Sequence, residues 1–535
     1  MAVGVAETIT ATSALDGQAL KSYPISNADD ITQNIKQARI AAENWAATPI
    51  AQRLSFMAAL QTAILEKIDH ITETLVTVTG KVKTEVILGE IYPILELIRY
   101  YEKNAAKILA PRSEVTSPFA FPDAKASIER QPYGVVAIIS PWNFPLQLTL
   151  NPLITALVAG NAVIFKTSEL SVPVGELILQ LCEHIALPQH LVQQVIGAAK
   201  TGESLIDNRP DLVFMTGGLN AGRAIMARAA QHPIPVMLEL GGKDAMLVFA
   251  DANLKRVCKA ALYGAFSNSG QVCVSVERLY VQDLCYTAFV QELCAATAKL
   301  TIGHGVEGDL GALTTLAQFE IVQAHYQDAL AKGAKASGEL QLHGRYLRPI
   351  VLWDVNHDMQ VMQEETFGAL LPVMAFSTQE QVIALANDSQ YGLNVSVWSL
   401  DIAQAEQVAR RLKVGNWAIN DVIKNIGHAG LPFGGVKNSG FGRYHGAEGL
   451  RQFTYTVSGL TSRSKLDDEP NWFPYSDDRY LQMRGFVDFL FGKGSLYQRI
   501  KRNGAALQAF RGYASSNLQQ HWHNLLIHLG IGRDF

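Results

Sequence analysis

The sequence predicts an α/β protein built on doubly wound parallel sheets. Short apolar runs, of which residues 135–139 are the first, alternate with stretches that have the periodicity of helices. These runs are apolar throughout rather than at every second position, which is typical of strands that are covered on both faces. Alternation of such strands with helices favours a parallel sheet that carries helices on both sides.

The first part of the chain is expected to be helical from about residue 28 to residue 109, with Ser26 or Asn27 as an N-cap. A separate helix is predicted over 92–109. Residues 115–130 are looser and contain two prolines, so no helix is expected there.

The middle of the chain divides into two halves with the same strand-and-helix pattern. Strands of the first half are expected at 135–139, 162–165, 191–196, 212–215, 237–240 and 246–249. Strands of the second half are expected at 278–281, 373–376 and 418–420, with a helix at 288–300. The sequence therefore predicts two doubly wound, Rossmann-like domains.

A C-terminal extension follows the last predicted strand, at 454–458. Residues 465–470 are polar and end in proline, which indicates a boundary. Aromatic residues between 480 and 491 suggest an amphipathic helix, and Arg499, Lys501, Arg502 and Arg511 make its middle basic. Two interpretations remain open: a helical tail packed on the protein, or a helix that lies on a membrane surface.

Composition limits the class of protein. At 535 residues, 48% hydrophobic and 18% charged, the chain is long enough for two or three domains with a large core. A net charge of −4 gives no field that favours nucleic acid. No apolar stretch is long enough to span a bilayer, and the N-terminus does not resemble a signal peptide. The five cysteines form no metal-ligand pattern, so we expect no metal, reduced thiols and a cytoplasmic location.

Cys273 is the strongest candidate for a nucleophile. It follows Asn268-Ser269-Gly270-Gln271-Val272, and Glu239 lies upstream in Leu238-Glu239-Leu240-Gly241-Gly242. A thiolate attacks carbonyl carbon, and a carboxylate can then activate water against the thioester. A single cysteine is ordinarily a small buried hydrophobe, so the surrounding segments decide between the two interpretations.

Those segments resemble the aldehyde dehydrogenase superfamily. The matching text is Pro141-Trp142-Asn143-Phe144-Pro145, Phe165-Lys166-Thr167-Ser168-Glu169, Glu365-Thr366-Phe367-Gly368 and Pro432-Phe433-Gly434-Gly435, in order with the Glu239 and Cys273 segments. The resemblance extends from the first helix to about residue 456. It is closest to the class 3 branch, which acts on fatty and aromatic aldehydes, through residues 148–154 and 433–440.

The resemblance implies a role for each catalytic residue. Cys273 forms a thiohemiacetal with the aldehyde and then a thioester. The side-chain amide of Asn143 and the backbone N–H of Cys273 stabilise the oxyanion. Glu239 activates the water that hydrolyses the thioester. Branches that transfer the acyl group to coenzyme A lack this glutamate, so a free acid is expected here.

The resemblance also implies a nicotinamide cofactor, NAD with NADP as a second choice. A glycine turn at 216–222 follows a strand and opens a helix, which suits a pyrophosphate. Gly218 stands where most members have serine, and Ala369 replaces a usual proline. The carboxylate of Glu169 favours NAD over NADP. The full set of expected cofactor contacts is Trp142, Lys166, Ser168, Glu169, Gly217, Gly218, Gly222, Leu240, Glu365 and Phe367.

Three functional hypotheses follow. The first is a dehydrogenase for apolar aldehydes, because Leu146, Leu148 and Leu150 lie beside the site. The second is a succinate-semialdehyde-type enzyme. It is disfavoured because Asn151 and Ser267 occupy positions where such relatives carry arginine. The third is an inactive binding descendant, disfavoured by the retained catalytic residues.

The expected domains are a dinucleotide-binding domain (1–112 and 133–239), a catalytic domain (240–450), oligomerisation strands (113–132 and 451–464) and a helical extension (465–535). Exposed strand edges favour pairing with another subunit, so a homo-oligomer, most simply a dimer, is expected.

Overall fold

The computed structural model describes residues 7–114, 116, 121, 124–306, 308–464, 467–469 and 471–509; Arg511 of the predicted basic tail lies outside them. The chain divides into two compact units. The first comprises Met1–Ile108 and Pro132–Tyr455, and the second comprises Leu109–Gln131 and Thr456–Phe535. All candidate catalytic and cofactor residues belong to the first unit.

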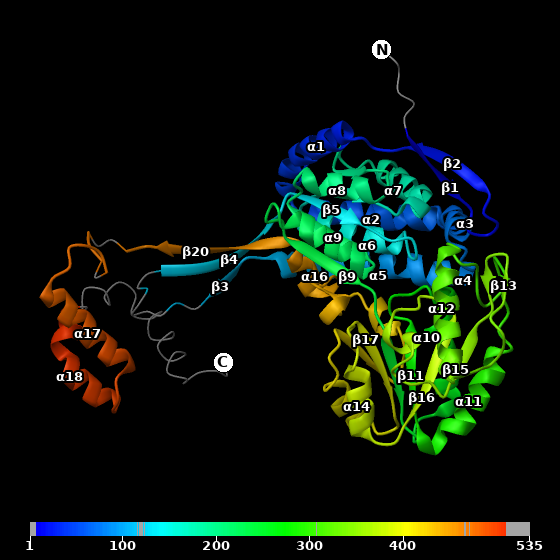
Figure 1. Ribbon diagram of the computed structural model, residues 1–535. Helices are drawn as coiled ribbons and strands as arrows, with labels where there is room; N and C mark the ends of the chain where they lie inside the picture. Colours follow the sequence, from blue (N-terminus) through cyan, green and yellow to red (C-terminus); the bar gives the residue numbers. More distant parts are fainter. Residues whose placement is uncertain are drawn as a thin grey trace, which may run out of the picture. The chain divides into compact units, whose positions relative to one another are not determined.

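The first unit contains a six-stranded sheet that is parallel except at one edge (Figure 1). Its order is β19-β9-β8-β5-β6-β7. The chain builds outward from β5 to β7, then returns to the other side of β5 with β8 and β9. The order therefore reverses between β5 and β8, where ligands bind in doubly wound sheets. The strands are β5 (Val135–Ile139), β6 (Ala162–Lys166), β7 (Val192–Gln194), β8 (Leu212–Gly217), β9 (Val236–Leu240) and β19 (Gly440–Phe441).

Helices cover both faces of this sheet, as the buried strands require. Asn27 caps α1 and accepts a hydrogen bond from the backbone N–H of Asp30 at 2.9 Å. Helix α6 is buried along its whole length, which agrees with its apolar character on all sides. These helices are α1 (Ala28–Ala46), α2 (Ile50–Glu66), α3 (Ile68–Thr79), α6 (Gln147–Ala159), α7 (Val172–His184), α8 (Ala199–Asp207), α9 (Leu219–Ala229) and α16 (Gly446–Gln452).

A second, seven-stranded sheet in the same unit has the order β12-β15-β16-β11-β10-β17-β18 and is parallel apart from β12. Its strands are β10 (Asp244–Val248), β11 (Val276–Gln282), β12 (Lys335–Ala336), β15 (Ile350–Trp353), β16 (Leu370–Phe376), β17 (Asn394–Trp398) and β18 (Asn416–Ile419). Its helices are α10 (Leu254–Phe266), α11 (Asp283–Thr297), α12 (Ala317–Ala331), α13 (Gln360–Gln363), α14 (Gln379–Asn387) and α15 (Ile402–Ala409). A continuous apolar core fills the space between sheet and helices.

The segment that reaches the nucleophile loop is helical with a change of winding. It runs through α4 (Lys83–Glu85), a π-helical turn (Val86–Ile91) and α5 (Tyr92–Leu109). π-Helical turns are rare in proteins, and those that occur are often found at functional sites. The predicted helix over 92–109 is therefore confirmed, and the turn before it brings Glu85 and Glu90 toward the site described below.

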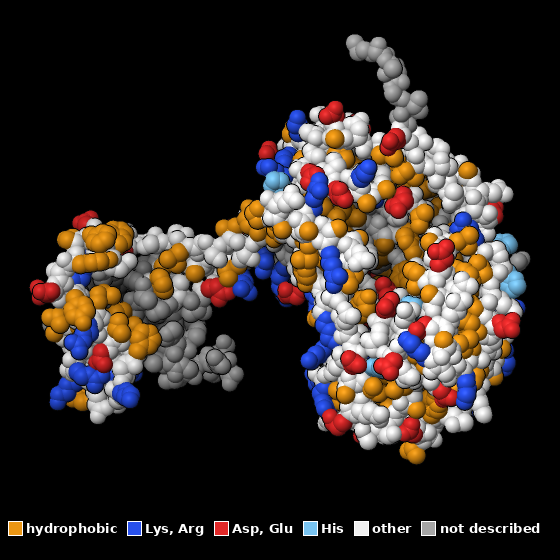
Figure 2. Space-filling model, viewed as in Figure 1, with side chains coloured by type: hydrophobic (Ala, Val, Ile, Leu, Met, Phe, Trp, Pro, Cys, Tyr) orange, Lys and Arg blue, Asp and Glu red, His pale blue; other side chains and the backbone are white. Residues whose placement is uncertain are grey.

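The second unit contains a three-stranded sheet and two helices. Its sheet has the order β20-β4-β3, formed by β3 (Arg112–Glu114), β4 (Ala124–Pro132) and β20 (Thr454–Ser462). The helices α17 (Asp477–Phe491) and α18 (Leu496–Ala509) pack on each other. Many apolar side chains of this unit remain exposed, and Figure 2 shows them gathered over the two helices. They include Trp472, Phe473, Tyr475, Tyr480, Leu481, Val487, Phe491 and Tyr497.

Several features of the fold differ from the sequence prediction. Residues 246–249 were assigned to the first half, but β10 belongs to the seven-stranded sheet, and β15 and β17 of that sheet were not predicted. An antiparallel N-terminal hairpin is formed by β1 (Thr8–Thr12) and β2 (Ala19–Pro24). In addition, β19 and α16 return to the first sheet before residue 450: Gly440 pairs with Glu239, and α16 contacts α6. A two-residue strand carries no periodic signal, so only tertiary pairing reveals it. A further short hairpin is formed by β13 (Leu342–His343) and β14 (Tyr346–Leu347).

In the part of the chain that the structure describes, every helix is too short or too polar to cross a bilayer.

Candidate active site

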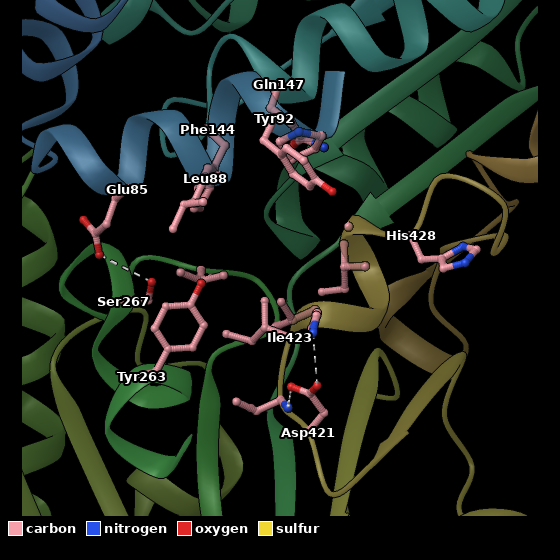
Figure 3. Close-up of a pocket in the computed structure, with 18 of the residues that line it drawn as sticks. Glu85, Leu88, Tyr92, Phe144, Gln147, Tyr263, Ser267, Asp421, Ile423 and His428 are labelled. Carbon is pink, nitrogen blue, oxygen red and sulfur yellow. Dashed lines mark hydrogen bonds and ion pairs between the residues drawn. The ribbon is translucent and has the colours of Figure 1, made fainter. Parts of the chain in front are cut away.

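A large cavity of about 1660 Å³ opens beside Cys273. Its walls come from the 82–104 segment, the start of α6, helix α10 and the loop 421–433. In Figure 3 the side chains of Leu88, Tyr92 and Phe144 face Tyr263 and Ile423 across it. Cys273 is the one cysteine of the five that lines this cavity; the described cysteines are all free thiols. No cluster of metal-ligating side chains is found in the described residues.

The loop before Cys273 is held in an unusual conformation. Asn268, Ser269 and Gly270 all have left-handed backbones, with φ of 51°, 56° and 79°. A Cβ on Gly270 would lie 2.3 Å from the carbonyl carbon of Gly368, so only glycine fits. The Ser269 hydroxyl donates to the Gly311 carbonyl at 2.7 Å, and Gln271 Nε2 donates to the Asn268 carbonyl at 2.9 Å. Such contacts fix strained residues at functional sites.

Glu239 lies next to Cys273 at the end of β9, in an apolar environment. Burial raises the pKa of Glu239 to about 8, and the neighbouring Cys273 thiol offsets part of this shift. Neither carboxyl oxygen of Glu239 has a hydrogen-bond partner in the described part of the chain. A buried carboxyl without a partner is costly and is therefore a candidate for chemistry.

Cys273 is equally perturbed. Part of its surface remains open to the cavity, but protein packs densely around the thiol. This burial raises the pKa of Cys273 well above 9, and the negative charges of Glu239, Asp244 and Glu365 add to the shift. The thiol therefore needs a base or a positive charge nearby before it can attack a carbonyl.

Asn143 meets the nucleophile loop from the opposite side. Its buried side-chain Nδ2 donates to the Gln271 carbonyl at 3.1 Å, which leaves the second hydrogen of that amide for another acceptor. Its own carbonyl accepts hydrogen bonds from Asn268 Nδ2 at 3.3 Å and from Lys81 Nζ. The structure thus brings together the three residues that were expected to be catalytic.

A buried ion pair fixes the Asn143 segment. Lys81 Nζ and Glu90 Oε1 are 3.0 Å apart, and both side chains are fully buried. Glu90 Oε2 also accepts from the backbone N–H groups of Leu146 and Gln147 at 3.1 and 2.9 Å, at the start of α6. Lys81 lies 4.2 Å from the Phe144 ring centroid. We consider both charges positioning residues, because their side-chain contacts other than the one with each other end on residues 143–147.

Glu85 connects the π-helical segment to the nucleophile loop. Its Oε1 accepts a hydrogen bond from the Asn268 backbone N–H at 2.6 Å and from the Ser267 hydroxyl at 3.4 Å (Figure 3). Burial raises its pKa, and the Asn268 N–H counters that shift. Lys81, Glu85 and Glu90 were not predicted from the sequence. A helical pattern does not distinguish a buried charged side chain from a solvated one.

The Glu365 loop closes the other side of the site. Glu365 Oε1 accepts from the Gly242 N–H at 3.2 Å, and burial raises its pKa to about 8. The next two backbone N–H groups, of Thr366 and Phe367, donate to Glu277 at 2.7 and 2.8 Å. Glu277 in turn pairs with the buried Lys243 at 2.6 Å. Glu277 is a further positioning residue. The sequence feature that could have indicated it is an acidic residue in the segment 276–281, which is otherwise mostly apolar.

Two groups of the predicted cofactor residues lie at the carboxyl ends of β6 and β8. The Lys166 ammonium donates to the Gly197 carbonyl at 2.8 Å, and burial lowers its pKa. Glu169 is exposed at the start of a short 3₁₀ turn (Glu169–Ser171), which Ser168 caps through the Leu170 N–H at 3.3 Å. These groups lie where a ribose is held in doubly wound sheets.

The glycine turn after β8 fits a pyrophosphate. β8 ends at Gly217, and α9 begins directly after Gly218. No atom lies within 4 Å of a Cβ built on Gly218, so the helix N-terminus is open to a ligand. The Thr216 hydroxyl is buried without a partner in the described structure. Gly222 packs against Leu240: a Cβ there would lie 2.8 Å from a Leu240 methyl carbon. The residues present therefore fit a dinucleotide.

Trp142 and Phe367 meet edge to face, with ring centroids 5.5 Å apart. Phe367 has a left-handed backbone, φ 51°, which Glu277 stabilises through the N–H contact given above. The two rings connect the Asn143 segment, which was expected beside the aldehyde, with the Glu365 loop, which was expected beside the nicotinamide.

Three sequence expectations about the substrate wall need refinement. Of the three leucines, Leu148 lines the cavity, whereas Leu146 and Leu150 are fully buried in the core. Asn151 is also buried and hydrogen-bonds His445 Nε2 instead of facing the cavity. Ser267 does line the cavity. A helix turns only part of its surface to one side, which decides these cases.

Residues 3–458 match the aldehyde dehydrogenase family. The chain belongs to this family. It is an enzyme that oxidises aldehydes. A 4,4'-diapolycopene aldehyde oxidase from Methylomonas sp is 58% identical over 98% of this chain and 99% of its own length. A protein named putative succinate-semialdehyde dehydrogenase [NADP(+)] 2, from Mycobacterium ulcerans (strain Agy99), is 33% identical over 87% of this chain and 91% of its own.

The solved structure of betaine aldehyde dehydrogenase from Staphylococcus aureus in complex with NAD⁺ has a TM-score of 0.80 and 28% identity. It covers 88% of this chain and 94% of its own length. The expected α/β fold is confirmed by this likeness. The family comparison ends at residue 458, whereas the Methylomonas relative spans the C-terminal extension as well.

Proposed function

We propose that this enzyme oxidises apolar aldehydes, of medium or long aliphatic or of aromatic character, to free carboxylic acids with NAD as cofactor and NADP as a second choice. The observation that supports this most is the pair of Cys273 and the unpartnered Glu239 beside a cavity of about 1660 Å³. Ordinary small-molecule sites have volumes of roughly 300–1,000 Å³, so the cavity is suited to a large substrate.

In the first half-reaction the Cys273 sulfur attacks the aldehyde carbon and forms a thiohemiacetal. The free hydrogen of Asn143 Nδ2 and the Cys273 backbone N–H are the donors for the oxyanion. Glu239 in its carboxylate form removes the thiol proton. The Lys81–Glu90 pair holds Asn143 in place before substrate arrives, which is how preorganised donors stabilise charge.

A bound nicotinamide would supply the hydride acceptor for oxidation of the thiohemiacetal to the thioester. The residues that hold it are proposed as Lys166, Ser168 and Glu169 for the adenosine ribose, Gly217, Gly218 and Gly222 for the pyrophosphate, and Glu365, Phe367, Trp142 and Leu240 for the nicotinamide side. Glu169 presents a carboxylate that repels a 2′-phosphate, so NAD is preferred.

In the second half-reaction Glu239 accepts a proton from water as the water attacks the thioester carbon. The C–S bond breaks, the Cys273 thiolate is regenerated, and the acid leaves. Because the pKa of Glu239 is raised to about 8 by burial, it is a stronger base than an exposed carboxylate.

The nature of the cavity wall supports an apolar substrate over a short charged one. Asn151 is buried away from the cavity, and Ser267 is bonded to Glu85, so neither position offers a cation beside the nucleophile. The Methylomonas relative, named for an apolar aldehyde, supports the same choice. The relatives named for succinate semialdehyde are the reason to test the alternative directly.

Cys273→Ser tests the mechanism, and a chain-length series tests the substrate. The serine variant should lose NAD⁺ reduction while its thermal transition is unchanged; substantial residual turnover would contradict the role. For wild type, each added methylene should contribute roughly 0.8 kcal/mol until the cavity is full. A preference for succinate semialdehyde over long neutral aldehydes would contradict the apolar assignment.

We further propose a cytoplasmic homo-oligomer, most simply a dimer, that touches membranes through the second unit. β20 is exposed over nearly its whole length, which favours pairing with a second copy. The exposed aromatic residues of α17 and the segment before it are of the type found at membrane surfaces. Light scattering of the full-length protein tests the oligomer, and a stable monomer would contradict it. Liposome sedimentation of full-length Phe473→Ser/Phe491→Ser beside wild type tests the membrane contact, and unchanged sedimentation of the variant would contradict it.

A further inference from the structure

The cavity has different chemistry near Cys273 and at its entrance. Buried apolar side chains, among them Leu148 and Phe433, surround the nucleophile. Half-exposed Tyr92 and Tyr263 follow them, and both point into the cavity in Figure 3. The remaining lining includes exposed cations on two separate helices.

Helix α10 provides a continuous path between the two ends. Lys255, Lys259, Tyr263 and Ser267 are spaced four residues apart, so they lie along one face of the helix, and all four line the cavity. Ser267 adjoins the nucleophile loop. Lys255 is twelve residues earlier, which corresponds to about 18 Å along the helix axis.

Helix α5, on the opposite wall of the cavity, shows the same change from aromatic to cationic side chains along its length. The α4 and π-helical segment before it carries the Glu85 contact with the nucleophile loop, and Tyr92, Tyr100 and Lys103 of α5 all line the cavity. Lys103 is eleven residues after Tyr92, or about 16 Å along the axis. The cationic ends of both helices are therefore far from Cys273, and their aromatic residues lie between.

The three lysines are the unpaired charges of this entrance. In the described structure Lys103, Lys255 and Lys259 form no ion pair, whereas Arg99 pairs with Glu96 at 3.5 Å. Arg256 donates to the Asn420 carbonyl at 3.2 Å. The other cation, Lys424, lies 4.0 Å from Asp421.

The acidic residues of the lining are already engaged. Glu85 accepts from Asn268, Asp309 accepts from the Thr301 N–H at 2.8 Å, and Asp421 accepts from the Val422 N–H at 2.8 Å. In addition, the first turn of α10 has no acidic residue, although a helix N-terminus favours negative charge. Lysines at this end of α10 lower the stability of the helix, and they add to the positive electrostatic potential that attracts an anion.

We propose that Lys255 and Lys259, one turn apart on α10, form a binding site for a carboxylate at the far end of a long aldehyde whose other end reacts at Cys273. This inference rests on the proposed oxidation of apolar aldehydes and names a subclass of substrates. The apolar middle of the cavity holds the chain, and the lysines hold the anion about 18 Å along α10 from the nucleophile loop. A short carboxylated aldehyde cannot span that distance, which separates this class from succinate semialdehyde.

The test compares two aldehydes of equal length, about 18 Å, one neutral and one with a terminal carboxylate, in the full-length enzyme. Wild type should show a higher kcat/KM for the carboxylated one, and the advantage should decline with salt, because these lysines are exposed. In Lys255→Gln/Lys259→Gln the ratio of the two kcat/KM values should fall about fivefold. The matched control, Lys36→Gln/Lys299→Gln, removes two exposed lysines outside the cavity and should keep the wild-type ratio.

A wild-type enzyme with no preference for the carboxylated chain, or a variant that loses both substrates equally, would overturn the proposal. Failure of the proposed function itself is recognised separately, because then the neutral long aldehyde is not oxidised either. In that case direct binding decides: calorimetry with a long dicarboxylic acid and a monocarboxylic acid of equal length should show tighter binding of the diacid by wild type. Equal binding would overturn the inference.

Discussion

Glu239 and Glu90 are two buried carboxyl groups of one active site, and their surroundings are opposite. Glu90 has a lysine at 3.0 Å and two backbone N–H donors. Glu239 has no hydrogen-bond partner in the described structure, and burial raises its pKa to about 8. The carboxylate with satisfied contacts fixes a loop, whereas the unsatisfied one retains a proton that it can exchange. Local pairing, more than burial, separates a positioning role from a chemical one.

The largest effect is expected from Glu239→Gln. An amide cannot accept the proton of the attacking water, so thioester hydrolysis should slow by about 10²–10⁴-fold. Stopped-flow measurement should show a burst of NADH followed by a slow phase, with an acyl adduct of Cys273 visible by mass spectrometry. Loss of the burst together with absence of any adduct would show that Glu239 is needed for the attack of Cys273 alone, and would contradict its proposed role in hydrolysis.

Stability should respond in the opposite way at the two positions. Glu90→Gln leaves Lys81 buried without a counter-charge, so the free energy of unfolding should fall by about 3–5 kcal/mol. Glu239→Gln removes a carboxyl that is already unpartnered and should be neutral or stabilising. Denaturant unfolding of both variants measures this contrast; a similar loss in both would contradict it.

The pH dependence follows from the raised pKa of Glu239. Its folded value of about 8 lies above the usual 4.5, so the folded state holds a proton that the unfolded state releases between these values. Stability due to this group is therefore present at low pH and declines as the pH rises from about 4.5 to about 8. The rate of thioester hydrolysis should increase over the upper part of this range, because the base must be ionised. Single-turnover hydrolysis that is independent of pH between about 6 and about 10, values about 2 units on either side of this pKa, would exclude Glu239 as the base.

Glu169 offers the smallest effect and a third kind of carboxylate, exposed rather than buried. Glu169→Gln removes the charge that repels a 2′-phosphate, so the ratio of kcat/KM for NADP⁺ over NAD⁺ should rise by about threefold to fivefold. The exposed Glu183→Gln, in the last turn of α7 and outside the cofactor residues, is the control. An unchanged cofactor ratio in Glu169→Gln would mean that this carboxylate points away from the ribose.

Much of the fold was predictable because its signals are local. Buried strands such as β5 are apolar at every position, and the helix over 92–109 ends near proline, so both were found from composition and periodicity. The hairpin of β1 and β2 was missed, since its strands are mostly exposed and lack an apolar pattern. The two-residue strand β19 was missed because its pairing with β9 is made by backbone atoms alone.

By itself the sequence determined the strand-and-helix order, the family and the identity of Cys273, Glu239 and Asn143 as candidates. The tertiary structure decided what state those groups are in. Burial without a partner raises the pKa of Glu239, and two charges far from it in sequence, Lys81 and Glu90, fix the Asn143 segment. It also decided which cations line the cavity, because the direction of a lysine depends on how α5 and α10 pack. Pairing, burial and direction are properties of contacts between distant segments, and a linear pattern does not contain them.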